Sequence, residues 1–228
     1  SRYMSQFIIG KMHFRLSLHS LRSTFDQIVE MSDEVERMID SRIQALERQA
    51  EEYRKIEDED FREYRMESLY EDFAVYDREW PHLMRKSQML SMCSYYEHQL
   101  TVFADRFAQI NGLEHRVRTL RHRGIHACRN LILKCGISEK VFNQSRWEEL
   151  AGLYAFRNRI VHAGGDLDEE TSIMLPDYTK YFLLPQEHEI PYAKDQIFLR
   201  KGAIRDISTL MIDVFSETGS ACSKHCER

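Results

Sequence analysis

The side chains best suited to chemistry lie close together about two-thirds of the way along the chain, in the stretch Phe156–Gly165. Arg157 stays charged at any relevant pH and can hold a phosphate through two hydrogen bonds. His162 supplies an imidazole, the side chain best suited to act as a general acid or base at neutral pH. Asn158 precedes it by four residues, a spacing that places both side chains on one flank of a helix. Together these residue types could bind a phosphate group and transfer a proton.

The surrounding residues predict a helix of about five turns. Ser145 followed by Glu148 forms a capping box at its start, and Gly164 with Gly165 is a natural stop. Arg157 falls in the middle of its apolar face, where a guanidinium is costly unless it is paired or used. A structural salt bridge therefore remains an alternative to a catalytic role. The apolar face consists of Leu150, Leu153, Tyr154, Ile160 and Val161.

The pattern Arg157-Asn158-x-x-x-His162 resembles the R-x4-6-H signature of the HEPN superfamily, small all-helical domains that include many metal-independent endoribonucleases. Upstream, the stretches 80–87 and 93–100 are similar to the first core helix of that family. The resemblance spans roughly residues 80–218. It implies Arg157, Asn158 and His162 as catalytic residues, and a homodimer in which two motifs face one composite cleft.

The resemblance further implies a toxin or phage-defence effector that cleaves RNA and is regulated by an antitoxin or another protein. A HEPN-like module that binds RNA, nucleotide or protein without cleaving is the alternative, and a purely structural helical protein is a third hypothesis. The scheme needs no metal and no cofactor. No Walker loop, Ser-His-Asp set or paired-carboxylate motif competes for catalysis.

Two further groups of charged residues are candidates for the site. Glu97 lies beside the apolar stripe of a helix expected from about 82 to 110, where it could reach Arg157 as a salt-bridge partner or as an active-site carboxylate. A basic segment follows that helix and suits phosphate contacts, although it is equally typical of a solvated helix face. Its candidate RNA-binding residues are Arg116, Arg118, Arg121 and Arg123.

Composition supports a globular, helix-rich chain. Of 228 residues, 43% are hydrophobic and only nine are glycine and four proline, so few loops are expected. Five scattered cysteines favour a reducing cytoplasm, and no apolar run is long enough to span a membrane. Residues 30–80 hold 18 acidic and 8 basic side chains, a balance of −10, although the whole chain carries only −5. An acidic arm is therefore joined to a mildly basic body.

These elements predict an all-α fold with a long N-terminal helical arm and a small β-hairpin insertion, and the resemblance implies that the remainder is a HEPN-like helical bundle. We expect an N-terminal segment and arm over 1–80, the HEPN-like domain over 81–218, and a tail over 219–228. Residues 5–19 alternate apolar and polar, which indicates a strand. The Gly- and Pro-free run 23–79 predicts one long helix, or an interrupted pair that packs on itself or on a second subunit.

Proline, glycine and β-prone residues along the chain provide the remaining predictions. Pro81 should end or kink the long helix. The β-prone runs 181–184 and 196–199 predict a small hairpin or a pair of extended segments. Residues 203–217 predict a last amphipathic helix that ends at Gly219. Cys222, His225 and Cys226 offer metal-binding residue types but lack a second pair at finger-like spacing, so a disordered tail is favoured. The acidic run 57–60 is interpreted as a solvated face, with RNA mimicry or antitoxin docking as the alternative.

Overall fold

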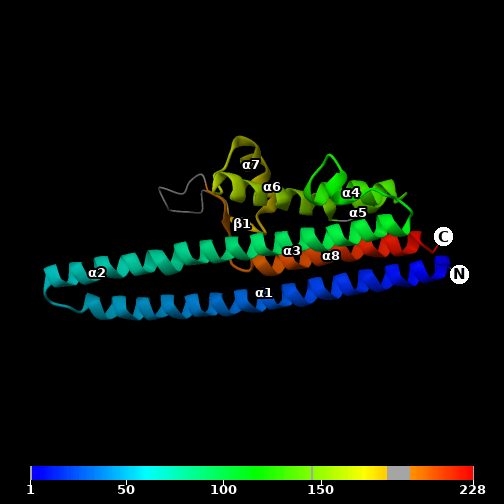
Figure 1. The fold of residues 1–228 in the computed structure, drawn as a ribbon. Coiled ribbons are helices and arrows are strands. Elements are labelled where there is room, and N and C mark those ends of the chain that lie inside the picture. Colours follow the sequence, from blue (N-terminus) through cyan, green and yellow to red (C-terminus); the bar gives the residue numbers. More distant parts are fainter. Residues whose placement is uncertain (1, 145, 184–195, 228) are drawn as a thin grey trace.

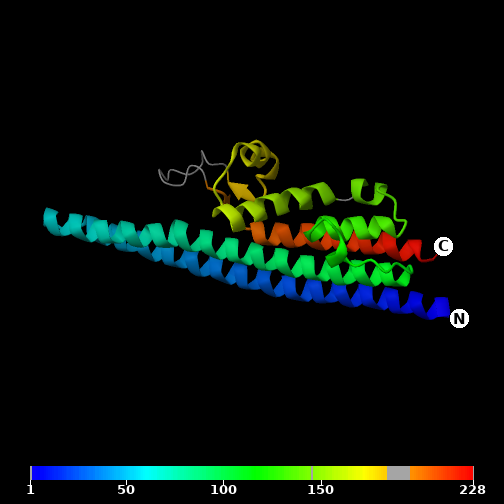
Figure 2. The ribbon, with the colours of Figure 1, turned by 45° about the horizontal axis from the view of Figure 1, so that its top comes forward.

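The computed structural model describes residues 2–144, 146–183 and 196–227 (Figures 1 and 2). The long elements are α1 (Arg2–Arg54), α2 (Glu59–Ala74), the π-helical turn η1 (Val75–Glu79), α3 (Trp80–Ile110) and α8 (Ala203–His225). The short elements between α3 and α8 are η2 (Val117–Thr119), α4 (Gly124–Lys134), α5 (Lys140–Gln144), α6 (Trp147–Ala163), α7 (Glu169–Met174), η3 (Leu175–Tyr178), β1 (Phe182–Leu183) and β2 (Phe198–Leu199). The predicted all-α class is confirmed.

The strand predicted over residues 5–19 is wrong, because this segment belongs to α1. The apparent alternation combines residues from two faces of the helix. Phe14 and Leu18 pack against the core, whereas Met12 and Leu16 are 53% and 56% exposed. The buried side chains continue at helical spacing through Leu21, so a three-four repeat determines the structure and the period of two is incidental.

The second half of α1 and the whole of α2 form a helical hairpin that extends from the body of the molecule (Figure 1). Of the two arrangements predicted for the Gly- and Pro-free run, this is the interrupted pair that packs on itself. Its own small core consists of Leu46, Ala50 and Leu69. The acidic run lies at the turn, where the Asp58 carboxylate accepts a hydrogen bond from the backbone N–H of Phe61 at 2.9 Å. One of these charges therefore caps α2.

The helix does not end at Pro81. The π-helical turn η1 directly precedes α3, and Pro81 lies in the first turn of that helix. In η1 the N–H of Trp80 bonds to the carbonyl of Val75, five residues earlier, and this wider turn accommodates a proline that has no N–H to donate. As a result α2, η1 and α3 follow one another as a continuous rod (Figure 1).

The body is built on α1, α3 and α8, which lie side by side in both views, with α8 antiparallel to α1 (Figures 1 and 2). Phe25 of α1, Tyr96 of α3 and Phe215 of α8 belong to one core of buried side chains. The first half of α1 therefore contributes to the same core as α3 and α8. The short helices α4–α7 form a second layer over this set (Figure 1).

The C-terminal prediction needs two corrections. Helix α8 continues past Gly219 to His225, so the expected stop and the disordered tail are both wrong. Gly219 is buried beneath the Phe14 ring, where a Cβ would overlap the aromatic carbons. The glycine therefore allows α1 and α8 to approach closely and does not end the helix. Within the described ranges, no cluster of three His, Cys, Asp or Glu side chains is placed to hold a metal ion.

The predicted hairpin is confirmed as a short antiparallel ribbon, in which Phe182 pairs with Leu199 and Leu183 with Phe198. Leu184 and the two prolines at 185 and 191 lie outside the described residues. Helix α7 and η3, which the sequence does not predict, fill the segment before β1. None of the described helices is both long and apolar enough to cross a lipid bilayer.

Gly219→Ala should lower the free energy of unfolding by about 1–3 kcal/mol, because the added methyl group must displace the Phe14 ring from a packed core. Thermal unfolding followed by circular dichroism measures the change. Ser220→Ala, at the exposed next position of α8, is the matched control and should unfold like the wild type. Equal melting temperatures for Gly219→Ala and the control would contradict the close helix approach.

Candidate functional site

Helix α6, which carries the motif, is held in place along its whole length. The Tyr154 hydroxyl donates to the carbonyl of Cys93 in α3 at 2.7 Å, and the Lys86 ammonium donates to the carbonyl of Gly164 at 2.9 Å. Burial lowers the pKa of Lys86, an effect opposed by Asp166. Gly164 adopts a left-handed conformation with φ 66°, which confirms it as the stop of the helix. These contacts fix the C-terminal half of α6 on α3.

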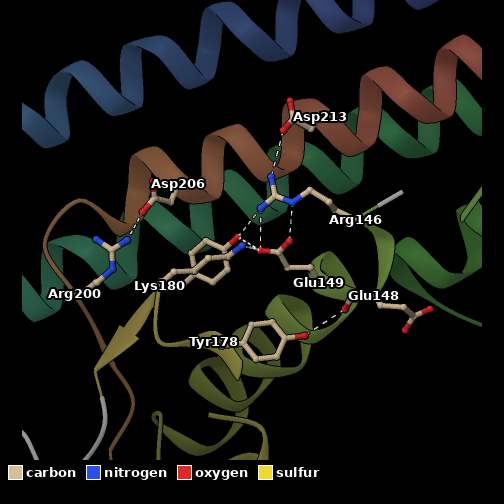
Figure 3. Close-up of polar contacts among 9 residues, drawn as sticks. Arg146, Glu148, Glu149, Tyr178, Lys180, Arg200, Asp206 and Asp213 are labelled. Carbon is tan, nitrogen blue, oxygen red and sulfur yellow. Dashed lines mark hydrogen bonds and ion pairs between the residues drawn. The ribbon is translucent and has the colours of Figure 1, made fainter. Parts of the chain in front are cut away.

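The start of α6 rests on a network of charged side chains centred on Glu149 (Figure 3). Arg146 donates to both Glu149 carboxylate oxygens, at 2.7 and 2.9 Å, and to Asp213 of α8 at 3.3 Å. Lys180 and the Tyr181 hydroxyl also contact Glu149. Burial alone would raise the pKa of Glu149, but hydrogen bonds from Arg146, Lys180 and Tyr181 outweigh this effect and hold it at about 2.

Two features of α6 concern its start and its packing against η3. The described helix begins at Trp147, and Ser145, the predicted cap, lies outside the described residues. The interior glycine has a packing role, because the Tyr178 ring occupies the space that a Cβ at Gly152 would need. The Tyr178 hydroxyl donates to the Glu148 carbonyl at 3.3 Å (Figure 3). Gly152 therefore lets η3 pack directly on α6.

The apolar face of α6 is largely as predicted. Leu150, Leu153, Tyr154 and Ile160 are buried. Val161 is 46% exposed, so its assignment to this face is wrong. Each residue advances about 100° around a helix, and Val161 is thereby turned away from the neighbouring Ile160 toward solvent. Phe156, fully buried, completes the face instead.

The motif side chains lie at the boundary between this buried face and solvent. Arg157 is half-buried, and its Nη1 donates to Asn158 Oδ1 at 2.9 Å. Its Nε is buried and has no hydrogen-bond partner among the described residues. Asn158 and His162 lie four residues apart in α6, on one flank of the helix as predicted, and both are exposed. Arg157 is thus the only motif residue that reaches inward.

Arg157 and Asn158 line a surface depression of about 310 Å³ between α6, α3 and the start of α4. Glu97 and Arg123 line it too, so two guanidinium groups and a carboxylate face one space. Glu97 and Arg157 form no ion pair in the part of the chain that the structure describes. His126 also lines the depression; nothing in the sequence distinguished it from the other histidines. His162 lies outside, one turn beyond Asn158.

The four arginines of the basic segment do not act together. Arg116 directs its guanidinium to the carbonyls of Leu113 and His115, at 3.1 and 2.9 Å, and so holds its own loop. Arg118 and Arg121 are exposed. Only Arg123 lines the depression beside Arg157. The structure therefore brings Arg157, Asn158, Glu97 and Arg123 together and leaves the other three arginines apart from them.

A thiol lies behind the motif but is not reactive. Burial raises the pKa of Cys93 to about 12, although the nearby Arg157 charge lowers it. The thiolate that nucleophilic chemistry requires is therefore scarce at neutral pH. The polar groups available to a ligand in the depression are the guanidinium, carboxylate, amide and imidazole groups of its wall.

Comparison of the chain with family models, with curated proteins and with solved structures gave no match. The fold and the depression around Arg157 are therefore the basis for assigning a function.

Glu149→Gln should destabilise the protein by about 1–3 kcal/mol at neutral pH, because three donors lose a charged acceptor. Since the pKa of Glu149 lies at about 2, below its ordinary 4.5, its charge stabilises the fold fully above pH 4.5 and loses this effect toward pH 2. The difference in melting temperature between wild type and variant should therefore shrink over that interval. Glu148→Gln, at an exposed neighbouring carboxylate, is the control. A difference that does not change with pH would disprove the assignment.

Proposed function

We propose that the chain is a metal-independent endoribonuclease of HEPN type, acting as a toxin or phage-defence effector. The observation that carries the proposal is Arg157, whose half-buried guanidinium lies on the wall of a depression near an exposed imidazole and whose Nε has no partner among the described residues. A buried N–H without a partner is costly, and a phosphate oxygen is an acceptor that would satisfy it. The resemblance of Arg157-Asn158-x-x-x-His162 to the HEPN signature supplies the reaction class.

In this mechanism His162 removes the proton from the 2′-hydroxyl of RNA, and the 2′-oxygen attacks the adjacent phosphorus. Arg157 holds the phosphate and stabilises the charge that develops on the crowded phosphorane. The bond from phosphorus to the 5′-oxygen then breaks, and an imidazolium returns a proton to that oxygen. Asn158, which accepts a hydrogen bond from Arg157, keeps the guanidinium oriented. The products are a 2′,3′-cyclic phosphate and a 5′-hydroxyl.

A second copy of the chain would complete this site. His162 lies outside the depression of its own protomer, and the scheme needs one group to remove a proton and one to return it. A composite cleft in which His162 of the partner subunit faces the same phosphate provides both. The same observation favours the alternative function, an RNA- or nucleotide-binding module that does not cleave, if the chain is monomeric.

His162→Ala should slow RNA cleavage by about 10²–10⁴-fold, because it removes the group that transfers the proton. Arg157→Lys keeps a charge but loses the planar fork of donors, so it should also reduce the rate strongly. Purified protein is incubated with total RNA in EDTA, and the new ends are tested for 2′,3′-cyclic phosphate. His19→Ala, at an exposed histidine of α1, is the matched control. Wild-type rates for His162→Ala, or loss of cleavage in EDTA, would refute the mechanism.

The composite site also makes a prediction about assembly. Light scattering at micromolar concentration should give the mass of a homodimer, and mixing inactive Arg157→Ala with inactive His162→Ala should restore part of the activity, since each contributes the group that the other lacks. A monomer that cleaves RNA would contradict the shared cleft. A chain that binds RNA but never cleaves it would be the binding module.

A further inference from the structure

In the body, α8 packs against both α1 and α3, whereas along the arm no third helix of the described chain covers α1 and α2. Helix α8 begins at Ala203. Two basic residues at its start pair with α1: Lys201, just before the helix, with Asp40 at 2.5 Å, and Arg205, within the helix, with Asp33. Among the described helices, α1 extends past that point beside the continuous rod of α3, η1 and α2, as both views show (Figures 1 and 2). Residues 41–54 of α1 thus extend about 20 Å past the start of α8.

The open groove lies on the side of the hairpin that α8 occupies in the body. Asp33, which pairs with a cation within α8, and Asp40, which pairs with one just before α8, are seven residues apart. Further steps of seven lead to Glu47 and Arg54. Glu47 and Arg54 line a groove of about 730 Å³ between α1 and α2. The face of α1 that binds α8 is therefore continuous with the α1 wall of this groove.

The opposite wall and the floor of the groove are apolar. Leu69 and Ala50 are the buried floor, and Met66, Tyr70 and Phe73 form the α2 side. Tyr70 is 64% exposed, a large ring that contributes little to the hairpin itself. An apolar floor between two helices, with charged residues along the rim, is the surface that an amphipathic third helix covers in a bundle.

Charge indicates the chemistry of that helix. Residues 41–79 hold 13 acidic and 7 basic side chains, a net charge of −6. Several of the arm's cations are already engaged, as in the Arg54–Glu51 and Lys55–Glu52 pairs. Glu47, one heptad beyond Asp40, and Arg48 both line the groove and have no ion-pair partner among the described residues, whereas Glu51 and Arg54 pair with each other. A cation on the incoming helix would pair with Glu47 as Lys201 pairs with Asp40.

We propose that the arm groove is a docking site for an amphipathic helix of another protein, with an apolar stripe flanked by lysine or arginine. The helix completes along the arm the three-helix arrangement that α8 completes in the body. This interaction is separate from RNA cleavage, because the groove lies on the arm and the motif lies on α6.

The test uses the full-length chain and a fluorescent peptide about two heptads long, with leucine at the core positions and lysine beside them. Such a peptide is too short to be a stable helix alone, so it orders only on a template. A peptide with glutamate in place of every lysine is the control. We expect saturable binding of the lysine peptide in fluorescence anisotropy, with a Kd of the order of micromolar, and binding of the glutamate peptide at least about 10-fold weaker.

Two exposed tyrosines of α2 provide matched variants. Tyr70→Glu should weaken binding of the lysine peptide at least about 10-fold, because it places a charge on the apolar wall. Tyr64→Glu, at a position 67% exposed and outside the groove, should change binding less than about twofold. Circular dichroism checks that both variants remain folded. No saturable binding, equal binding of the two peptides, or equal effects of the two variants would overturn the proposal.

Sedimentation of the same variants separates a foreign helix from a second copy of this chain. The proposal expects Tyr70→Glu to leave the mass of the protein unchanged. If Tyr70→Glu converts a dimer to a monomer while Tyr64→Glu does not, the groove belongs to a contact between two copies and the proposal is wrong. RNA cleavage is not a readout in either experiment, so these outcomes are independent of the nuclease mechanism.

Discussion

The position of the motif helix depends on the ionised carboxylate of Glu149. Burial opposes its charge, yet Arg146, Lys180 and Tyr181 together hold its pKa at about 2. These donors come from the residue before α6 and from the segment that precedes β1, and Arg146 also reaches Asp213 of α8 (Figure 3). One charge therefore joins three parts of the chain that are distant in sequence. Without it, several donors would remain half-buried without their acceptor, which is why such networks are strongly cooperative.

A fixed α6 determines what each motif residue can do. With the helix held on α3 by Tyr154 and Lys86, its rotation about its own axis is set, and Arg157 must lie at the edge of the buried face. Asn158 then faces solvent and His162 follows it on the same flank. Helical spacing on this fixed helix therefore places the Arg157 guanidinium on the wall of the depression and the His162 imidazole outside it.

Sequence periodicity predicted the elements whose buried residues recur at one spacing, such as α3, α8 and the self-packing hairpin. It failed where a residue type can have either of two structural roles. Gly219 indicates a helix stop, but here it is the contact point for Phe14, and only the neighbouring helix reveals this. Pro81 indicates a break, but a π-helical turn accommodates it. The alternation around Met12 mixes core and solvent faces of one helix.

In the site, too, the sequence predicted features that depend on neighbouring residues and missed those that depend on tertiary packing. The shared flank of Asn158 and His162 and the stop at Gly164 are local features, so the sequence predicted them. Which of the four basic-segment arginines meets Arg157 depends on how the loop before α4 folds back on α3. The Arg116 guanidinium donates to the carbonyls of Leu113 and His115, whereas Arg123 donates to the carbonyl of Arg118 and still lines the depression, and no spacing rule distinguishes the two.

The arm and the motif helix are connected through two consecutive residues of α3. Arg85 donates to both carboxylate oxygens of Glu36, at 2.6 and 2.8 Å, and to the carbonyl of Leu199, so it joins α1, α3 and β2. Both side chains of that ion pair are less than 15% exposed, and breaking it would leave a buried charge uncompensated. Lys86, the next residue, holds the end of α6. Arg85 and Lys86 thus bond α3 to α1 and β2 and to the end of α6. The arm is therefore joined to a section of α3 that is held by several neighbours. A helix bound to the arm groove would therefore extend the bundle without displacing the motif.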